Sequence, residues 1–222
     1  MAGNVRGADA SAVGSLVGRL PAASSTDPNV PTRFANDDNF HVLRIEPYLL
    51  TAASKNLDLR AQIVEVADTT ASTHLALVHG DVSPKNILVG PDGPVLLDAE
   101  CAWFGDPAFD PAFVLNPLVL KAVVQPDHVD ALERTSHALL DAYDHHVSWE
   151  DTSSLHSRIG RLMPVLMLAR VDCSSPVEYL DLAEQAAVLA ISRSLIAGPP
   201  LRIRDLLDDV FRRVDRIRAH KT

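Results

Sequence analysis

This chain is poor in cysteine, in aromatic residues and in positive charge. Its 222 residues include two cysteines, Cys101 and Cys173, and aromatic side chains make up 5% of the sequence. Two isolated cysteines form neither a paired metal-ligating motif nor a disulfide framework, so we expect a reducing compartment, namely the cytoplasm. Lysine and arginine number 20 against 29 acidic residues, a formal net charge of −9. That balance argues against nucleic acid as a partner, because sequence-independent binding requires clustered basic side chains.

Long apolar runs are missing as well. No stretch approaches the roughly 20 apolar residues that span a bilayer. The N-terminus carries glycines and charges where a signal peptide has a continuous apolar segment. We therefore expect no association with a membrane. The hydrophobic fraction of 47% in a chain of this length predicts a domain with a substantial core.

The chain divides into a polar N-terminal segment and a mainly helical remainder, residues 41–222. Residues 1–40 are rich in Ala, Ser, Gly, Asn and Asp and contain several prolines, so apart from a short possible helix over residues 10–20 we predict loop or disorder there. Beyond them, apolar residues recur at intervals of three and four. This spacing predicts helices over residues 43–54, 57–70, 112–124, 129–146, 155–168, 177–196 and 203–219.

One short β segment interrupts the helices. Two apolar runs, residues 87–89 and 95–97, flank the turn Pro91-Asp92-Gly93. The pattern predicts a β-hairpin, because proline presets φ and glycine accepts positive φ. The predicted fold class is therefore α+β and predominantly helical, with a small hairpin beside the polar residues that lie between His79 and Asp110.

The polar residues around this hairpin are the types that phosphoryl transfer requires. Asp81 lies between an apolar run and turn-forming residues, where a fixed carboxylate can accept the proton of a substrate hydroxyl. Asn86 follows five residues later, and Asp98 ends the second strand, so the hairpin can fold Asp98 back towards Asn86. An amide oxygen and a carboxylate are hard ligands of the kind that Mg²⁺ prefers.

The same region contains HGDVSPKNIL, then VLLDAE, then FGDPAFD. These segments resemble the catalytic core of the aminoglycoside phosphotransferase and choline kinase-like family, which shares the protein-kinase fold. The resemblance implies a kinase-like C-terminal lobe and a transferase that uses ATP and Mg²⁺ to phosphorylate the hydroxyl of a small molecule. It assigns Asp81 as the catalytic base and Asn86 and Asp98 as the Mg²⁺ ligands. It assigns three residues to the structural support of the site: His79, Asp106 and Asp110.

Further residues are candidates for contact with the reactants. Ser83 and Lys85 lie within the loop and are candidate phosphate contacts, with a solvated surface lysine as the alternative for Lys85. Trp103 is a candidate for stacking on the substrate, with packing beneath the site as the alternative. Glu178 begins a row with Asp181 and Glu184 that would suit a cationic substrate, whereas such rows are usually solvated helix faces.

The resemblance covers about residues 43–196, since residues 166–180 also resemble a C-terminal stretch of some bacterial members. Pro111 stands where the family usually has leucine, a change that the first turn of a helix tolerates. Ahead of residue 40 we find no Gly-rich loop and no strand with a nucleotide-anchoring lysine. We therefore expect the C-terminal lobe alone, without the N-terminal nucleotide-binding lobe.

Three functions follow from these observations. The first is a small-molecule O-phosphotransferase of the aminoglycoside, choline or sugar kinase type. The second is a truncated, non-catalytic lobe, an interaction module or inactive fragment that would self-associate through the surface that an N-terminal lobe normally covers. The third is a metal-dependent hydrolase using Asp81, Asp98 and His79, which lacks the additional ligands of a two-metal site. The sequence does not name the phosphate acceptor.

Overall fold

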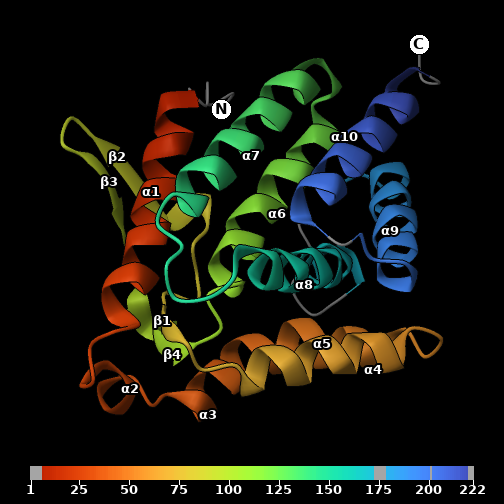
Figure 1. Cartoon of the computed structure of the whole chain (residues 1–222). Coiled ribbons are helices and arrows are strands. Elements are labelled where there is room, and N and C mark those ends of the chain that lie inside the picture. The colour runs from red at the N-terminus through yellow and green to blue at the C-terminus, as the bar shows by residue number, and fades with distance from the viewer. Residues whose placement is uncertain (1–6, 173–178, 201, 220–222) are drawn as a thin grey trace.

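The computed structural model describes residues 7–172, 179–200 and 202–219, and helices form most of it (Figure 1). The longer helices are α1 (Gly7–Ser24), α5 (Arg60–Ser72), α6 (Phe109–Val124), α7 (Val129–Asp144), α8 (Thr152–Asp172), α9 (Leu182–Ala197) and α10 (Ile203–Ala219). The shorter ones are α2 (Val30–Arg33), α3 (Asp37–Phe40), the π-helix η1 (His41–Leu50), α4 (Thr51–Lys55) and the 3₁₀ helices η2 (Pro84–Asn86), η3 (Ala99–Cys101) and η4 (Pro126–His128).

The β structure consists of small antiparallel pairs. Strand β1 (Ala76–Val78) pairs with β4 (Trp103–Gly105), and β2 (Ile87–Gly90) pairs with β3 (Gly93–Leu96). In the second pair Gly90 faces Gly93, so Pro91 and Asp92 form the loop, and Gly93 has a φ of 107°. The predicted hairpin and the predicted mainly helical fold class are confirmed.

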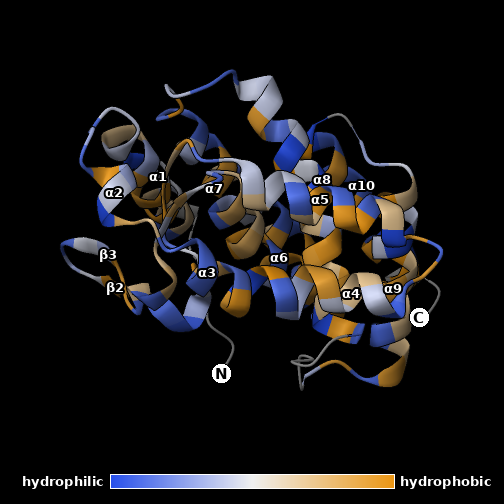
Figure 2. Cartoon of the chain, turned by 90° about the horizontal axis from the view of Figure 1, so that it is seen from below, coloured by the Kyte–Doolittle hydropathy of each residue, from blue (hydrophilic) through white to orange (hydrophobic). Residues whose placement is uncertain are grey.

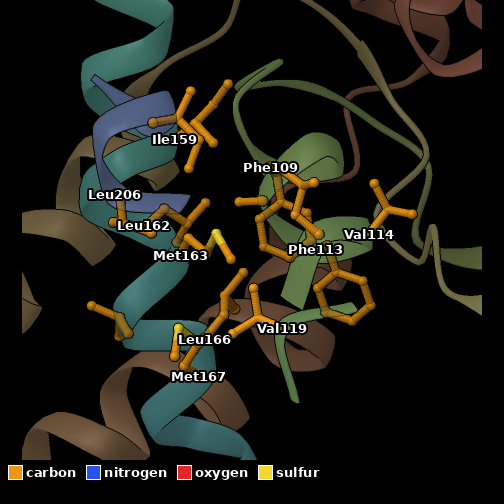
Figure 3. Close-up of a cluster of buried hydrophobic side chains, with 14 of the residues drawn as sticks. Phe109, Phe113, Val114, Val119, Ile159, Leu162, Met163, Leu166, Met167 and Leu206 are labelled. Atoms are coloured by element: carbon orange, nitrogen blue, oxygen red, sulfur yellow. The ribbon is translucent and has the colours of Figure 1, made fainter. Parts of the chain in front are cut away.

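Helix α6 lies at the centre of the core, between α7 and α8. Almost all of its side chains are buried, including the polar Asp110 and Asn116. In Figure 3 its residues Phe109 and Val119 face Met163 of α8. Fully burying an apolar side chain of this size contributes about 1.5–3 kcal/mol relative to leaving it exposed. The core therefore holds α6 firmly, and α6 in turn carries residues of the candidate site.

Apolar and polar residues are both present on α5, α8 and α9 (Figure 2). Helix α9 starts later than its apolar spacing predicted. Asp181 accepts a hydrogen bond from the backbone N–H of Glu184, and Glu184 accepts one from the N–H of Asp181. This capping box sets the first turn at Leu182. Within the described residues, no helix has the length and apolar character needed to cross a membrane.

The prediction of loop or disorder over residues 1–40 is wrong for the described part of that segment, where α1 forms a long helix and α2 and α3 follow it. Helix α1 lies along α7 (Figure 1). Gly14 and Gly18 are one turn apart on the contact face, where a Cβ on Gly14 would overlap the carbonyl oxygen of Leu139 and one on Gly18 would lie 2.8 Å from that of Tyr143. Both glycines fall within the short helix considered over residues 10–20, and they allow two helix backbones to approach closely, a role that the sequence did not indicate.

We expect Gly14→Ala to lower the free energy of unfolding by about 1–3 kcal/mol, because the added methyl group forces α1 away from α7. Alanine would otherwise stabilise an isolated helix by about 1 kcal/mol. Urea unfolding of the purified variant measures the change. The control is Gly198→Ala, where the added Cβ meets no atom within 4 Å. Equal stability of the two variants would contradict the close packing.

Candidate active site

The loop that follows β1 is held by a buried carboxylate. Asp110, in the first turn of α6, accepts hydrogen bonds from the backbone N–H of His79 at 2.8 Å and of Gly80 at 2.9 Å. Burial raises the pKa of Asp110, and the two backbone N–H groups act in the opposite direction. Asp110 is thus placed as a supporting residue must be, and Pro111 lies within the first turn of the same helix.

The backbone of Gly80 packs against the part of the chain that follows Asp98. Its φ is 78°, and a Cβ at this position would lie 2.8 Å from the carbonyl oxygen of Cys101 in η3. A side chain is therefore excluded both by the backbone conformation and by the space available. The thiol of Cys101 is buried, and burial raises its pKa.

Three donors converge on one carboxylate oxygen of Asp81. The residue as a whole is 6% exposed. Asn86 Nδ2 donates a hydrogen bond to Asp81 Oδ2 at 2.8 Å, Arg44 Nη2 lies 3.2 Å from the same oxygen, and Lys85 Nζ lies 3.3 Å from it. Asp81 Oδ1 makes no hydrogen bond with a described residue. The arrangement fixes the carboxylate and leaves one oxygen able to accept a proton.

The sequence analysis missed Arg44. Its Nε donates to the carbonyl oxygen of Gly80, its guanidinium lies 5.6 Å from the centre of the Phe113 ring, and it is 8% exposed. Arg44 Nη1 also donates to the carbonyl oxygen of Leu43 at 2.8 Å. An arginine on a helix is usually solvated, so no sequence signal distinguishes this one.

Asn86 and Asp98 lie at the base of the hairpin. The N–H of Leu97 donates to the carbonyl of Asn86 at 2.9 Å, so Leu97 is opposite Asn86 and Asp98 follows directly in the chain. Asn86 Nδ2 donates hydrogen bonds to Asp81, and Asn86 Oδ1 is the atom that can bind a cation. The Asp98 side chain is exposed and has no hydrogen bond or ion pair with a described residue. These oxygens fit the preferences of Mg²⁺.

The backbone of Asp98 is left-handed, with φ 64° and ψ 61°. It is the one non-glycine residue with positive φ among those that the structure describes. Such a conformation costs about 1–2 kcal/mol for most side chains and less for aspartate. Backbone conformations of this kind cluster at functional sites, where the surrounding structure maintains them.

Several polar atoms near Asp81 are buried without a partner. His79 Nδ1 accepts from the N–H of Asp81 at 3.3 Å, but His79 Nε2 and Ser83 Oγ have no hydrogen bond. His79 therefore supports the loop from within, through the backbone of Asp81. Unpaired buried polar groups are uncommon in folded proteins, and they concentrate where a ligand or water completes the bonding.

Residues 34–40, predicted as loop, hold the chain that follows Asp98. Asn39 donates to the carbonyl of Glu100 at 2.8 Å, and Asn36 donates to that of Ala102 at 2.9 Å. Trp103 Nε1 donates to Asp37 at 3.1 Å. The hydrogen bond from His74 lowers the pKa of Asp37, and the bond from Trp103 acts in the same direction.

The substrate-stacking role considered for Trp103 is wrong. Its ring is 1% exposed and stacks on Phe40 with a centroid distance of 4.3 Å, so it packs beneath the site. The contact with a cationic substrate considered for the acidic row is wrong for Asp181 and Glu184, because the side chains of both form the capping box of α9. Glu178 and Cys173 lie outside the described residues.

A pocket of about 500 Å³ opens beside Asp81. Ser83, Lys85 and Asp98 line it together with Asp81 at the loop side. The remaining described walls come from η1, α6, the end of α8 and the approach to α9: Arg44, Tyr48, Phe113, Asn116, Pro117, Leu120, Lys121, Arg170 and Tyr179. The candidate base and the predicted metal ligand Asp98 thus face one cavity.

Asp106 lies behind the site. It accepts from the N–H of Ala108 at 2.9 Å and pairs with Arg158, whose Nε lies 3.1 Å from Asp106 Oδ1. Arg158 also donates to both carboxylate oxygens of Glu150, at 2.8 and 2.7 Å. Burial raises the pKa of Asp106, and the positive charge of Arg158 opposes this. The pairing ties the turn before α6 to α8.

We expect Arg158→Met to lower the free energy of unfolding by about 3–5 kcal/mol near pH 7, because it leaves the buried Asp106 without its cation. The variant raises the folded-state pKa of Asp106 further. Stability linked to a raised pKa is fully present below the unfolded pKa and is lost as the pH rises through the folded pKa. The loss of unfolding free energy in the variant should therefore be smaller near pH 4 than near pH 7. Urea unfolding at several pH values measures this difference.

The control for this experiment is Arg161→Met, which removes an arginine of α8 paired with the exposed Glu65. An exposed pair contributes about 0–1 kcal/mol. A pH-independent deficit in Arg158→Met, or one equal to that of Arg161→Met, would show that Asp106 does not depend on this cation.

Residues 2–147 match the phosphotransferase enzyme family, a range that includes the loop, the hairpin and Asp110. Over 79 residues the chain is 30% identical to methylthioribose kinase 1 and 29% identical to methylthioribose kinase 2, both of Oryza sativa subsp. japonica. Each match covers 36% of this chain and 18% of the kinase, so the chain spans less than a fifth of these relatives. The family match begins well before residue 43, where the resemblance was expected to start. With two thirds of its length matched, the chain belongs to the phosphotransferase enzyme family.

Proposed function

We propose that this chain takes part in transferring a phosphoryl group from ATP to a hydroxyl group of a small molecule. The observation that carries the proposal is the convergence of Arg44, Lys85 and Asn86 on Oδ2 of Asp81, beside a pocket of about 500 Å³. A carboxylate held on one oxygen presents the other in a fixed position. The family match supports the same reaction class.

In this proposal Asp81 is the general base. A substrate hydroxyl in the pocket donates its proton to Asp81 Oδ1 while its oxygen attacks the terminal phosphorus of ATP. The bond from that phosphorus to the bridging oxygen breaks, and ADP leaves. Positioned proton transfer of this kind contributes roughly 10²- to 10⁴-fold to a rate. Most of the remaining acceleration in phosphoryl transfer comes from positioning and charge stabilisation. The buried setting of Asp81 suits both proton transfer and positioning, because a fixed carboxylate needs no reorganisation during the reaction.

Asn86 Oδ1 and the Asp98 carboxylate would hold Mg²⁺, which neutralises charge on the phosphates of ATP. Ser83 Oγ, buried without a partner, and Lys85, whose side chain is 71% exposed, are proposed phosphate contacts. His79, Asp106 and Asp110 are proposed as supporting residues, since each holds backbone of the loop or of the turn before α6.

The relatives named as methylthioribose kinases act, by their names, on a small sugar derivative. A small polyhydroxy molecule is the acceptor class that this likeness supports for the present chain. The pocket has a volume suited to a molecule of that size.

A non-catalytic interaction module is the alternative, favoured by one surface. Leu88 and Val95 face each other across the hairpin, and Leu97 follows two positions after Val95. Each is at least 40% exposed. An apolar face of this kind promotes association with another protein or with a second copy.

Calorimetric titration with ATP, with and without Mg²⁺, tests the proposal. We expect Mg²⁺-dependent binding that Asp98→Gly weakens by about tenfold or more, because a carboxylate ligand is removed while glycine accepts the left-handed backbone. Asp81→Asn should keep this binding but lose about 10²- to 10⁴-fold in turnover. The control is Asp92→Gly in the exposed hairpin turn. Absence of ATP binding, together with concentration-dependent self-association, would favour the interaction module.

We also expect Arg44→Gln to lower turnover by about tenfold, equivalent to about 1.4 kcal/mol, with little change in KM for ATP. Glutamine cannot bond to both Gly80 and Asp81 while supplying a charge. Arg44→Lys should recover only part of the loss, because an ammonium lacks the planar fork of donors. Arg60→Gln, at an exposed position on α5, is the control. Wild-type turnover in both Arg44 variants would contradict a positioning role.

A further inference from the structure

We infer that the phosphate acceptor carries a negatively charged group, a carboxylate or a phosphate, remote from the hydroxyl that reacts. The inference rests on the proposed function, because it names the class of acceptor for the same pocket. It is carried by the distribution of charge along the pocket and by one buried amide.

The acidic side chains that line the described walls all lie on one side of the pocket. Asp81, Asp98 and Glu100 belong to the loop side, where Asp81 is already paired with Arg44 and Lys85. The wall formed by α6 and the end of α8 contributes two cations, Lys121 and Arg170. That wall presents no acid among the described residues. A positively charged group on the acceptor would be repelled there, and an anion would be attracted.

Lys121 and Arg170 form no ion pair with a residue that the structure describes. Other arginines of α8, α9 and α10 do: Arg158, Arg161, Arg193 and Arg204 each pair with carboxylates. Arg170 and Tyr179 both line the pocket, and the charge of Arg170 opposes the effect of burial, which raises the pKa of Tyr179. Together they offer a charge and a hydroxyl donor, the groups that hold a carboxylate or phosphate.

Asn116 supplies a separate indication that this wall contacts a ligand. Its side chain is 3% exposed and lines the pocket, and its Oδ1 has no hydrogen-bond partner. A buried carbonyl without a hydrogen-bond donor is unfavourable. A cation at the C-terminal end of a helix is favourable in itself, but that effect does not account for the unpaired amide. A hydroxyl of a bound acceptor, donating to Asn116, would satisfy it.

The spacing along α6 sets the size of the acceptor. Phe113 lies beneath Arg44, which holds Asp81, and Lys121 follows eight residues later on the same face. At 1.5 Å per residue this corresponds to roughly 12 Å along the helix axis. The long side chains of Lys121 and Arg170 shorten the distance to be bridged. One sugar-sized body with an anionic substituent spans it, with Asn116 between the two ends.

Calorimetric titration of the whole chain without ATP tests the inference with matched probes: glucose 6-phosphate, ribose 5-phosphate and gluconate against glucose, ribose and glucosamine. We expect at least one anionic probe to bind about tenfold or more tightly than its neutral parent and than glucosamine, and to weaken as salt rises from about 0.05 to 0.5 M. The phosphate and carboxylate arms identify which anion the pocket prefers. Binding confined to neutral or amino sugars, or no binding by any anionic probe, would overturn the inference.

Variants locate the binding. Lys121→Gln and Arg170→Gln should each weaken binding of the anionic probe by about fivefold or more, since each removes a charge-assisted contact. Both residues are partly exposed, and circular dichroism verifies that the variants fold. The control, Lys55→Gln with Arg60→Gln, removes the same two charges at exposed positions that do not line the pocket. If the control weakened binding of the anionic probe equally, the effect would come from net charge alone. That outcome would overturn the assignment of Lys121 and Arg170 to the anion.

The two proposals fail separately. Binding of an anionic probe by a chain that neither binds ATP nor transfers phosphate would keep the acceptor class and refute the phosphotransferase. Transfer from ATP to glucose or glucosamine in preference to the anionic probes would keep the phosphotransferase and refute the acceptor class. Asp81→Asn should retain probe binding, because its side chain acts on the hydroxyl and not on the anionic end.

Discussion

The backbone around Gly80 is the point on which the site depends. Asp110 accepts its N–H, Arg44 donates to its carbonyl oxygen, and Cys101 occupies the space that a Cβ would need. These contacts join α6, η1 and the chain after Asp98 at one residue. Because Asp81 is the next residue, its position is set by all three. A carboxylate held in this way needs no movement to act, which is the condition for effective charge stabilisation.

The surrounding charges are arranged in two ways. Behind the site, the buried Asp106 and the partly buried Arg158 and Glu150 are engaged with one another, so they stabilise the turn before α6. At the pocket, Asp98, Lys121 and Arg170 make no ion pair with described residues. A buried polar atom without a partner, such as Asn116 Oδ1 or Ser83 Oγ, costs stability, and proteins retain such atoms where a ligand or water completes the bonding. The strained backbone of Asp98 fits the same pattern.

Much of the architecture could be predicted because it follows from neighbours in sequence. The hairpin follows from Pro91-Asp92-Gly93, and helix α10 follows from its apolar spacing. Helix α1 was expected only as a short helix over residues 10–20, and the sequence did not indicate that its glycines contact α7. Trp103 was considered for the substrate, since an aromatic side chain beside a motif gives no indication of which way it faces. Only packing against Phe40 decides that.

The sequence by itself determined the local geometry: the spacing of His79, Asp81, Asn86 and Asp98, the hairpin between them, and the family to which they point. Tertiary structure alone decided which charges meet. Arg44 bonds to Gly80 across 36 residues, and Trp103 bonds to Asp37 across 66. Likewise, Lys121 and Arg170 share a pocket only because α6 and α8 pack together. Periodicity reports which side of an element is apolar, but the free energy of a charge depends on what surrounds it in three dimensions.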